Sequence, residues 1–111
     1  DKIVHKSANI SKLKVFMTKK RLNAIVEGQV QGVSFRFYTQ QRAHKLGITG
    51  WVRNNPNRTV EVVAEGSDEA LGQLLDFLKT GSPAAKVKQV QVNWEDATGE
   101  FDDFRIAYHR G

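Results

Sequence analysis

The sequence contains no cysteine among its 111 residues. This absence excludes disulfide bonds, zinc–thiolate sites and a cysteine nucleophile together, and it agrees with a reducing compartment, so we expect a cytoplasmic protein. Long apolar runs are missing as well. No stretch approaches the roughly 18 residues of a membrane span, and the N-terminus lacks the positive-then-apolar order of a secretory signal. We therefore expect no membrane partner.

Metal-binding patterns are also absent. His5, His44 and His109 are scattered without the spacing of metal ligands or of a catalytic triad. The acidic run Glu95, Asp96, Glu100, Asp102 and Asp103 is typical of a solvated loop rather than of a cation site. We therefore expect no metal site.

What remains is an ordinary globular composition, with 40% hydrophobic and 26% charged residues. A chain of this length predicts a single domain that buries roughly 60% or more of its unfolded surface, and we expect a monomer.

The net charge of +5 is unevenly distributed. Residues 1–16 carry four lysines against one aspartate, and Met17, the only methionine, precedes the first strand pattern. We interpret residues 1–16 as an N-terminal extension, a tag or a flexible segment, and residues 17–111 as the domain. The alternative is an additional native strand or tail. The basic charge is only weak support for a nucleic-acid partner.

Hydrophobic periodicity predicts the order β-α-β-β-α-β-β. Alternating residues favour strands within 21–28, 48–54, 59–66, 86–94 and 103–109, whereas helical spacing occupies 34–47 and 67–81. Ser34 and Ser67 are the expected N-caps, and Gly47 is the expected end of the first helix. In the last two strands the expected buried side chains are Val90, Val92, Trp94, Phe104, Ile106 and Tyr108. The pattern predicts an α/β (α+β) ferredoxin-like two-layer sandwich, with an antiparallel sheet of five strands and two helices on one face.

The stretch "GQVQGVSFR", residues 28–36, connects the first strand to the first helix. Glycines at 28 and 32 permit positive φ, the loop between them holds no acid, and a helix N-terminus with an arginine follows. These features are compatible with a phosphate cradle and equally with an ordinary glycine-containing turn beside a surface arginine.

A second motif makes the pattern specific. "GQVQGVSFR" is followed, eighteen positions after Arg36, by the asparagine of "GWVRN", with "VEVVAEG" and "GSP" downstream. In this order and spacing the motifs resemble those of the acylphosphatase family, from about Arg21 to Tyr108. The resemblance implies a ferredoxin-like enzyme that hydrolyses the carboxyl-phosphate bond of small-molecule acyl phosphates without a metal or cofactor.

The resemblance also implies which residues act. Arg36 and Asn54 are the catalytic pair: Arg36 binds the phosphoryl group and Asn54 orients the attacking water. The phosphate-binding loop comprises Gly28, Gln29, Val30, Gln31, Gly32 and Val33. Phosphate and sulfate are then expected as competing anions. The sequence departs from the family at residues 1–16 and at His109–Gly111, which lie beyond the terminal "F-x-I-x-Y" pattern.

Two alternatives belong to other classes. Ferredoxin-like sheets also bind RNA, and "VSFRFY" has a basic-aromatic composition. However, this run falls in a predicted helix, and Glu27, Glu61 and Glu65 are expected on the open sheet face, so we expect no nucleic acid. The other alternative is an acylphosphatase-like domain of a larger carbamoyl-phosphate-handling enzyme.

Overall fold

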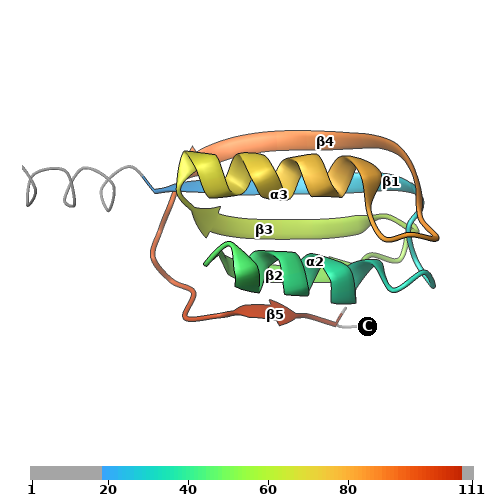
Figure 1. Cartoon of the computed structure of the whole chain (residues 1–111), viewed down its shortest axis with the longest axis horizontal. Helices are drawn as coiled ribbons and strands as arrows, with labels where there is room; N and C mark the ends of the chain where they lie inside the picture. Colours follow the sequence, from blue (N-terminus) through green and yellow to red (C-terminus); the bar gives the residue numbers. More distant parts are fainter. Residues whose placement is uncertain (1–18, 109–111) are drawn as a thin grey trace, which may run out of the picture.

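The computed structural model describes residues 19–108. Its elements are β1 (Lys20–Gln29), α2 (Phe35–Lys45), β2 (Thr49–Asn54), β3 (Val60–Gly66), α3 (Asp68–Thr80), β4 (Lys86–Asp96) and β5 (Phe104–Ile106). This is the predicted order (Figure 1). The expected extension, Met17 as a start, His5 and His109–Gly111 all lie outside the described residues.

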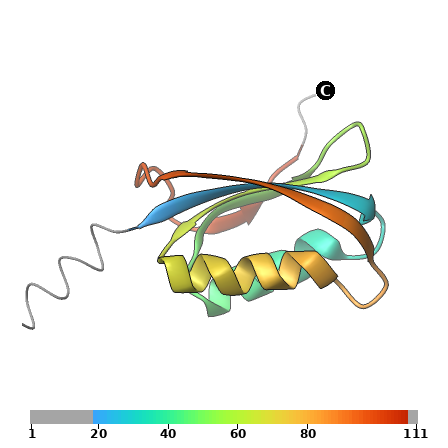
Figure 2. The ribbon, with the colours of Figure 1, turned by 90° about the horizontal axis from the view of Figure 1, so that it is seen from above.

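The five strands form one sheet in the order β4-β1-β3-β2-β5, and both helices cover the same face of it (Figure 2). The ferredoxin-like two-layer sandwich is therefore confirmed. One pairing was predicted wrongly: β5 runs parallel to β2, with Trp51 opposite Arg105, so the sheet is mixed rather than antiparallel. Alternation identifies which face of a strand is buried but carries no information about the direction of its neighbour.

The core lies between the sheet and the helices, as the alternating pattern predicts. Leu22, Ala24 and Val26 of β1 have no solvent-exposed surface, and neither do Val60 and Val62 of β3. From α3 the apolar stripe contributes three fully buried leucines, Leu71, Leu74 and Leu78. None of the helices between residues 19 and 108 is both long and apolar enough to cross a membrane.

The two helices begin differently. In α3 the Ser67 hydroxyl accepts a hydrogen bond from the Ala70 amide at 3.1 Å, so this N-cap is confirmed. Ser34 occupies the cap position of α2, but its side chain makes no capping hydrogen bond. Its backbone is left-handed, with φ of 61°, whereas a capping serine normally has an extended backbone. The predicted position is right and the predicted interaction is wrong.

Three side chains expected to be buried are exposed. Val92 and Trp94 lie on the helix-facing side of β4 but remain 37% and 47% exposed, because β4 is at the edge of the sheet. Tyr108 follows the end of β5 and is 75% exposed. Phe104, by contrast, is fully buried as predicted.

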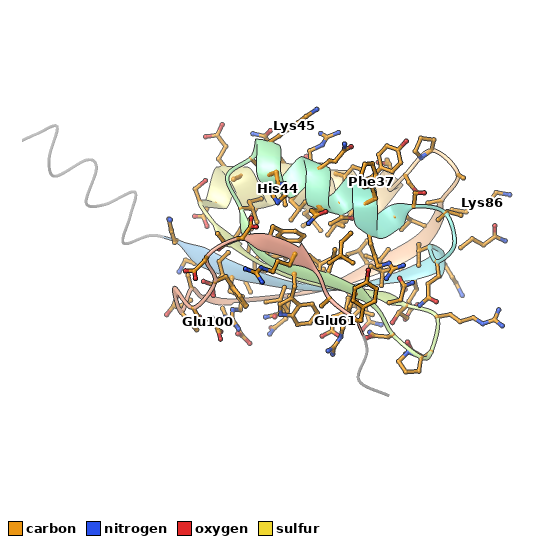
Figure 3. The ribbon with its side chains drawn as sticks, turned by 90° about the horizontal axis from the view of Figure 1, so that it is seen from below. Phe37, His44, Lys45, Glu61, Lys86 and Glu100 are labelled. Carbon is orange, nitrogen blue, oxygen red and sulfur yellow. The ribbon has the colours of Figure 1, made fainter. Side chains whose placement is uncertain are left out.

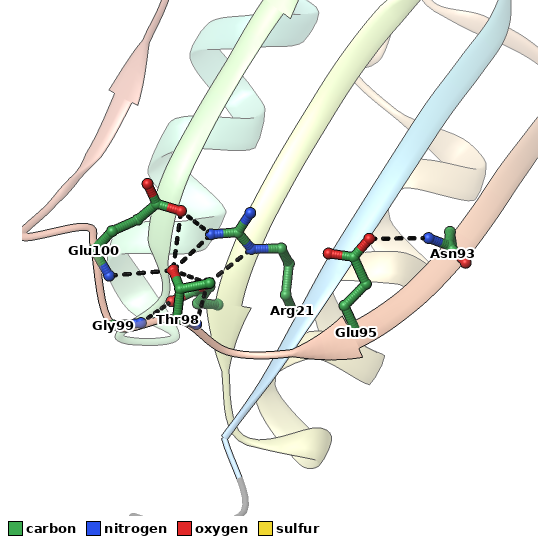
Figure 4. A network of polar contacts seen from close by, with 7 residues as sticks. Arg21, Asn93, Glu95, Thr98, Gly99 and Glu100 are labelled. Carbon is green, nitrogen blue, oxygen red and sulfur yellow. Dashed lines mark hydrogen bonds and ion pairs between the residues drawn. The ribbon is translucent and has the colours of Figure 1, made fainter.

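A polar network fixes the connection between β4 and β5 to the open face of the sheet (Figure 4). The buried carboxylate of Glu65 accepts hydrogen bonds from Arg21 Nε at 2.7 Å, from the Thr98 amide at 2.9 Å and from the Gly99 amide at 3.0 Å. The same arginine forms an ion pair with Glu100. Burial acts to raise the pKa of Glu65, but the hydrogen bonds from Thr98, Arg21 and Gly99 outweigh it and hold the pKa below its ordinary value.

Candidate active site

The loop after β1 depends on its glycines. A bulge interrupts the pairing of β1 with β4 between Glu27 and Gly28, where φ is 134°. A Cβ atom at Gly28 would lie 2.1 Å from the carbonyl oxygen of Lys86, so only glycine allows this close approach. Gly32 has φ of 75°, which a residue with a side chain rarely adopts. The loop therefore has a fixed bend at each end.

Side chains from other elements hold the loop in place. Gln31 Nε2 donates to the carbonyl oxygens of Asn55 and Thr59, each at 2.9 Å, and so ties the loop to the turn between β2 and β3. The buried Ser82 hydroxyl donates to the carbonyl of Val33 at 2.6 Å. The sequence marked Ser82 only as part of "GSP" and gave no role to these anchors, because their partners are distant along the chain.

The first turn of α2 presents free backbone donors beside the loop. Its first internal hydrogen bond runs from the Tyr38 amide to the Ser34 carbonyl at 3.1 Å. The amides of Phe35, Arg36 and Phe37 therefore have no acceptor within the helix. Together with the helix dipole, such groups favour a bound anion.

Arg36 and Asn54 line the same pocket, although they are distant in sequence. The pocket has a volume of about 350 Å³. It is lined by Val30, Gly32, Ser34, Phe35, Arg36, Phe37, Asn54, Ile106 and Tyr108. The structure thus brings the predicted catalytic pair together with part of the predicted loop. Gly28, Gln29, Gln31 and Val33 do not line this pocket; they border a separate hollow beside Arg58.

Arg36 is an unpaired cation in this pocket. Within residues 19–108 it has no carboxylate partner, and its guanidinium carbon lies 5.6 Å from the centre of the Tyr108 ring. Arg21 and Arg53, in contrast, both form ion pairs with glutamates. The positive charge of Arg36 is therefore available to a ligand.

Asn54 ends β2 on the helix-facing side of the sheet, in step with the buried Val52. Its Oδ1 is buried and has no hydrogen-bond partner among the described residues. A buried polar atom without a partner is rare and often marks a position filled by water or ligand. The neighbouring Arg53 lies on the other face, 4.7 Å from the centre of the Trp51 ring and 3.0 Å from Glu61.

A larger cavity than the Arg36 pocket lies elsewhere. A groove of about 650 Å³ runs beside β2 and β5 on the open face and is bordered by the β4–β5 connection. Glu61 and Glu100 lie on this side of the sheet, away from Phe37 and His44 on α2 (Figure 3). The groove contains none of the predicted loop residues, and acidic side chains surround its arginines. The pocket of about 350 Å³ contains Arg36 and no aspartate or glutamate, so it is better suited to bind an anion.

The other sequence candidates have structural surroundings. His44 Nε2 lies 3.0 Å from the Phe104 carbonyl oxygen and 3.3 Å from Asp103, which links α2 to β5. Between residues 19 and 108 no group of three or more side chains has an arrangement that could hold a metal ion. The basic-aromatic run is helical, and Glu61 and Glu65 are on the open face, so the features that argued against an RNA-binding sheet are present.

The fold and the pocket define the class of protein: a small ferredoxin-like α+β domain with a pocket between a glycine loop, a helix N-terminus and a strand end. Comparison with known proteins specifies the family. The acylphosphatase family model matches residues 22–106. An acylphosphatase of Pelotomaculum thermopropionicum is 48% identical over 92 residues, which cover 83% of this chain and all of the relative.

Solved structures agree. The crystal structure of acylphosphatase from Bacillus subtilis superposes with a TM-score of 0.78 at 37% identity, covering 80% of this chain and 99% of the other. A full-length HypF in a phosphate- and nucleotide-bound form superposes with a TM-score of 0.73 at 26% identity, but the match covers only 12% of that protein. The chain belongs to the acylphosphatase family and is a hydrolase of acyl phosphates.

Proposed function

We propose that Arg36 and Asn54 carry out this hydrolysis, with the phosphoryl group bound in the 350 Å³ pocket that both residues line. The observation that carries the assignment is the buried, unpartnered Oδ1 of Asn54 beside an arginine without a carboxylate partner among the described residues. The free acceptor of Asn54 can receive a hydrogen bond from a water molecule, and the free cation of Arg36 can bind a phosphoryl oxygen in the same pocket.

Binding of the phosphoryl group uses charge and backbone donors. The Arg36 guanidinium is planar and offers paired N–H donors to two phosphoryl oxygens. The amides at the start of α2 point to the same region and need no reorganisation when charge develops on these oxygens. We assign the predicted loop, Gly28–Val33, to the same task, with Val30 and Gly32 nearest to the ligand because they line the pocket.

Asn54 positions the nucleophile. Its Oδ1 accepts a hydrogen bond from the water, which fixes the direction of the water lone pair toward phosphorus. A carboxamide does not take up a proton at neutral pH. The water proton passes instead to a phosphoryl oxygen of the substrate. Catalysis then comes from orientation and from stabilisation of charge in the transition state.

The leaving group explains why so few residues are needed. Water attacks phosphorus, the bond from phosphorus to the acyl oxygen breaks, and the electron pair leaves with a carboxylate. A carboxylate is stable without a proton, so no general acid is required. None of the residues lining the pocket is an aspartate, glutamate or histidine. We therefore propose a reaction that requires neither a metal nor a cofactor.

The test separates binding from catalysis at Asn54. Asn54→Ala should lower kcat for benzoyl phosphate by on the order of 10²-fold, by analogy with the loss of another positioned polar group, while inhibition by inorganic phosphate hardly changes. Asn54→Asp should not restore activity, because its negative charge repels the phosphoryl oxygens. Full activity in the alanine variant would refute the assignment. Full activity in the aspartate variant would show that a protein base is limiting.

The location, the oligomeric state and the competing anions are proposed as well. We propose that the enzyme acts as a cytoplasmic monomer, in agreement with its lack of cysteine, and that phosphate and sulfate compete for its pocket. Size-exclusion chromatography with light scattering tests the monomeric state, and inhibition kinetics with phosphate and with sulfate tests their competition for the pocket.

A second candidate is that this chain acts as the acylphosphatase-like domain of a larger carbamoyl-phosphate-handling enzyme. The match to 12% of the full-length HypF favours the domain part of this proposal, because the same fold occurs there within a longer protein. Relative rates distinguish the two roles. A kcat/KM for carbamoyl phosphate far above that for benzoyl phosphate would support the second candidate, whereas the opposite order supports an independent acyl phosphate hydrolase.

A further inference from the structure

Two exposed aromatic side chains border the phosphate pocket. Phe37, in the first turn of α2, is 51% exposed, and Tyr108, after β5, is 75% exposed. Both line the pocket that contains Arg36 and Asn54, and the partly buried Ile106 lies between Phe104 and Tyr108 in the same wall. Large apolar side chains left in water beside a pocket often mark a surface that a ligand covers.

Neither ring is required by the core. The buried positions of α2 are Phe35, Thr39 and Ala43, so Phe37 belongs to the solvent-facing side of the helix. Its edge contacts the Tyr38 ring at a centroid distance of 5.8 Å, and no other ring contact involves it among the described residues. Tyr108 stacks only on Arg36. Packing therefore does not explain why these two positions are aromatic.

The charge of the pocket determines the kind of ligand. The Arg36 guanidinium has no carboxylate partner among the described residues and lines the same pocket as the two rings. A ligand that contacts all three side chains must therefore have an anionic head and a flat apolar tail. An acyl phosphate of an aromatic carboxylic acid has this form. An acetyl group is too small to cover either ring once the phosphoryl group is bound.

We propose that Phe37 and Tyr108 form a subsite for the acyl group and that this enzyme prefers aryl acyl phosphates to short aliphatic ones. The inference rests on the placement of the phosphoryl group at Arg36 described above. Tyr108 has a second effect, because its ring also holds the guanidinium at the pocket. The Phe37 ring does not stack on the Arg36 guanidinium, so Phe37 is the cleaner test.

The experiment compares benzoyl phosphate with acetyl phosphate in the parent chain and in Phe37→Ala. The variant should lose about 3- to 10-fold in kcat/KM for benzoyl phosphate, mainly through a higher KM, and nothing for acetyl phosphate. Trp94→Ala is the matched control, since Trp94 is a similarly exposed aromatic residue on β4, outside this pocket. It should leave both substrates unaffected.

Binding without turnover provides an independent measurement. Phenylphosphonate should inhibit the parent more strongly than methylphosphonate, and Phe37→Ala should remove this difference while inhibition by inorganic phosphate is retained. An unchanged preference in Phe37→Ala, or an equal loss for both substrates, would overturn the subsite. Failure of the proposed function would look different: the parent would hydrolyse both substrates, yet Arg36 and Asn54 variants would retain full activity.

Discussion

Arg36 differs from the other arginines of α2 and β1 in what surrounds its charge. Arg21 is neutralised by two glutamates, and Arg42 lies over the Phe77 ring at 5.2 Å. Among the described residues Arg36 has no carboxylate partner, and its guanidinium lies over the exposed ring of Tyr108 in the pocket that also contains Asn54. At the scale of single residues, the lack of a carboxylate partner for Arg36 among the described residues is therefore the feature that indicates ligand binding.

Replacing Arg36 should weaken anion binding directly. Arg36→Ala should raise the inhibition constant of inorganic phosphate by about 10- to 100-fold, because charge-assisted hydrogen bonds are lost. Arg42→Ala removes a guanidinium from the same helix and should leave that constant unchanged. Competitive inhibition measured with benzoyl phosphate distinguishes the two. Unaltered phosphate inhibition in Arg36→Ala would mean that another group binds the anion.

Gly72 has no visible function in α3. A Cβ atom placed there would meet nothing within 4 Å, and its φ is not positive. Gly72→Ala should therefore raise the free energy of unfolding by about 0.4–1 kcal/mol, since alanine loses less backbone entropy in a helix. Gly28→Ala is the contrasting variant and should destabilise the fold, because its Cβ would overlap the Lys86 carbonyl. Chemical denaturation of both variants checks the signs.

At the scale of elements, hydrophobic periodicity predicts which face of a strand or helix is buried. The buried faces of β1 and α3 follow from alternating and helical spacing of apolar residues, and the structure confirms them. In β3 every residue from 62 to 66 is buried, so alternation does not describe its burial. Strand direction is not encoded in this way, so the parallel pairing of β5 was missed. The exposure of Trp94 was missed for a related reason: alternation places it on the helix-facing side but does not reveal that β4 is an edge strand.

The candidate site was also predicted only in part from the sequence. Motifs identified Arg36, Asn54 and the glycine loop, and the structure brings Arg36, Asn54, Val30 and Gly32 to one pocket. The anchors of the loop were not predictable, because Ser82 bonds to a carbonyl 49 positions away and no local pattern marks such a pair. Phe37 and Tyr108 were assigned no role in ligand binding, since exposure cannot be derived from residue type.

The network around Glu65 makes the β4–β5 connection sensitive to acid. Because the folded pKa of Glu65 lies below its ordinary value of 4.5, the unfolded chain binds a proton more readily than the folded chain. The carboxylate therefore contributes stability above about pH 4.5, and this contribution is lost as the pH falls through the folded pKa. Glu65→Gln should be less stable than the parent at pH 7, and the difference should narrow at pH 3.

Urea unfolding at the two pH values measures this effect. Glu27→Gln is the control, because Glu27 lies on β1 at the same open face of the sheet as Glu65, but within the described residues it accepts a single side-chain hydrogen bond, from Gln91 Nε2 at 3.3 Å. A stability difference for Glu65→Gln that is equal at both pH values would show that the carboxylate charge does not matter.

For the whole molecule, the family match begins at residue 22, after the proposed extension. We propose that residues 17–111 form the functional domain. Removal of residues 1–16 should leave kcat/KM for benzoyl phosphate and the thermal midpoint nearly unchanged, as measured by steady-state kinetics and calorimetry. A fall of many degrees would show that the segment packs against the domain.

The pocket also joins the two ends of the described chain. Val30 and Arg36 come from its first quarter, whereas Ile106 and Tyr108 follow every other element. A stop codon after Gly99 would still encode four of the five strands and both helices, but it would remove one wall of the pocket. A truncating mutation near the 3′ end of the gene would therefore remove part of the pocket while most strands and both helices are still encoded.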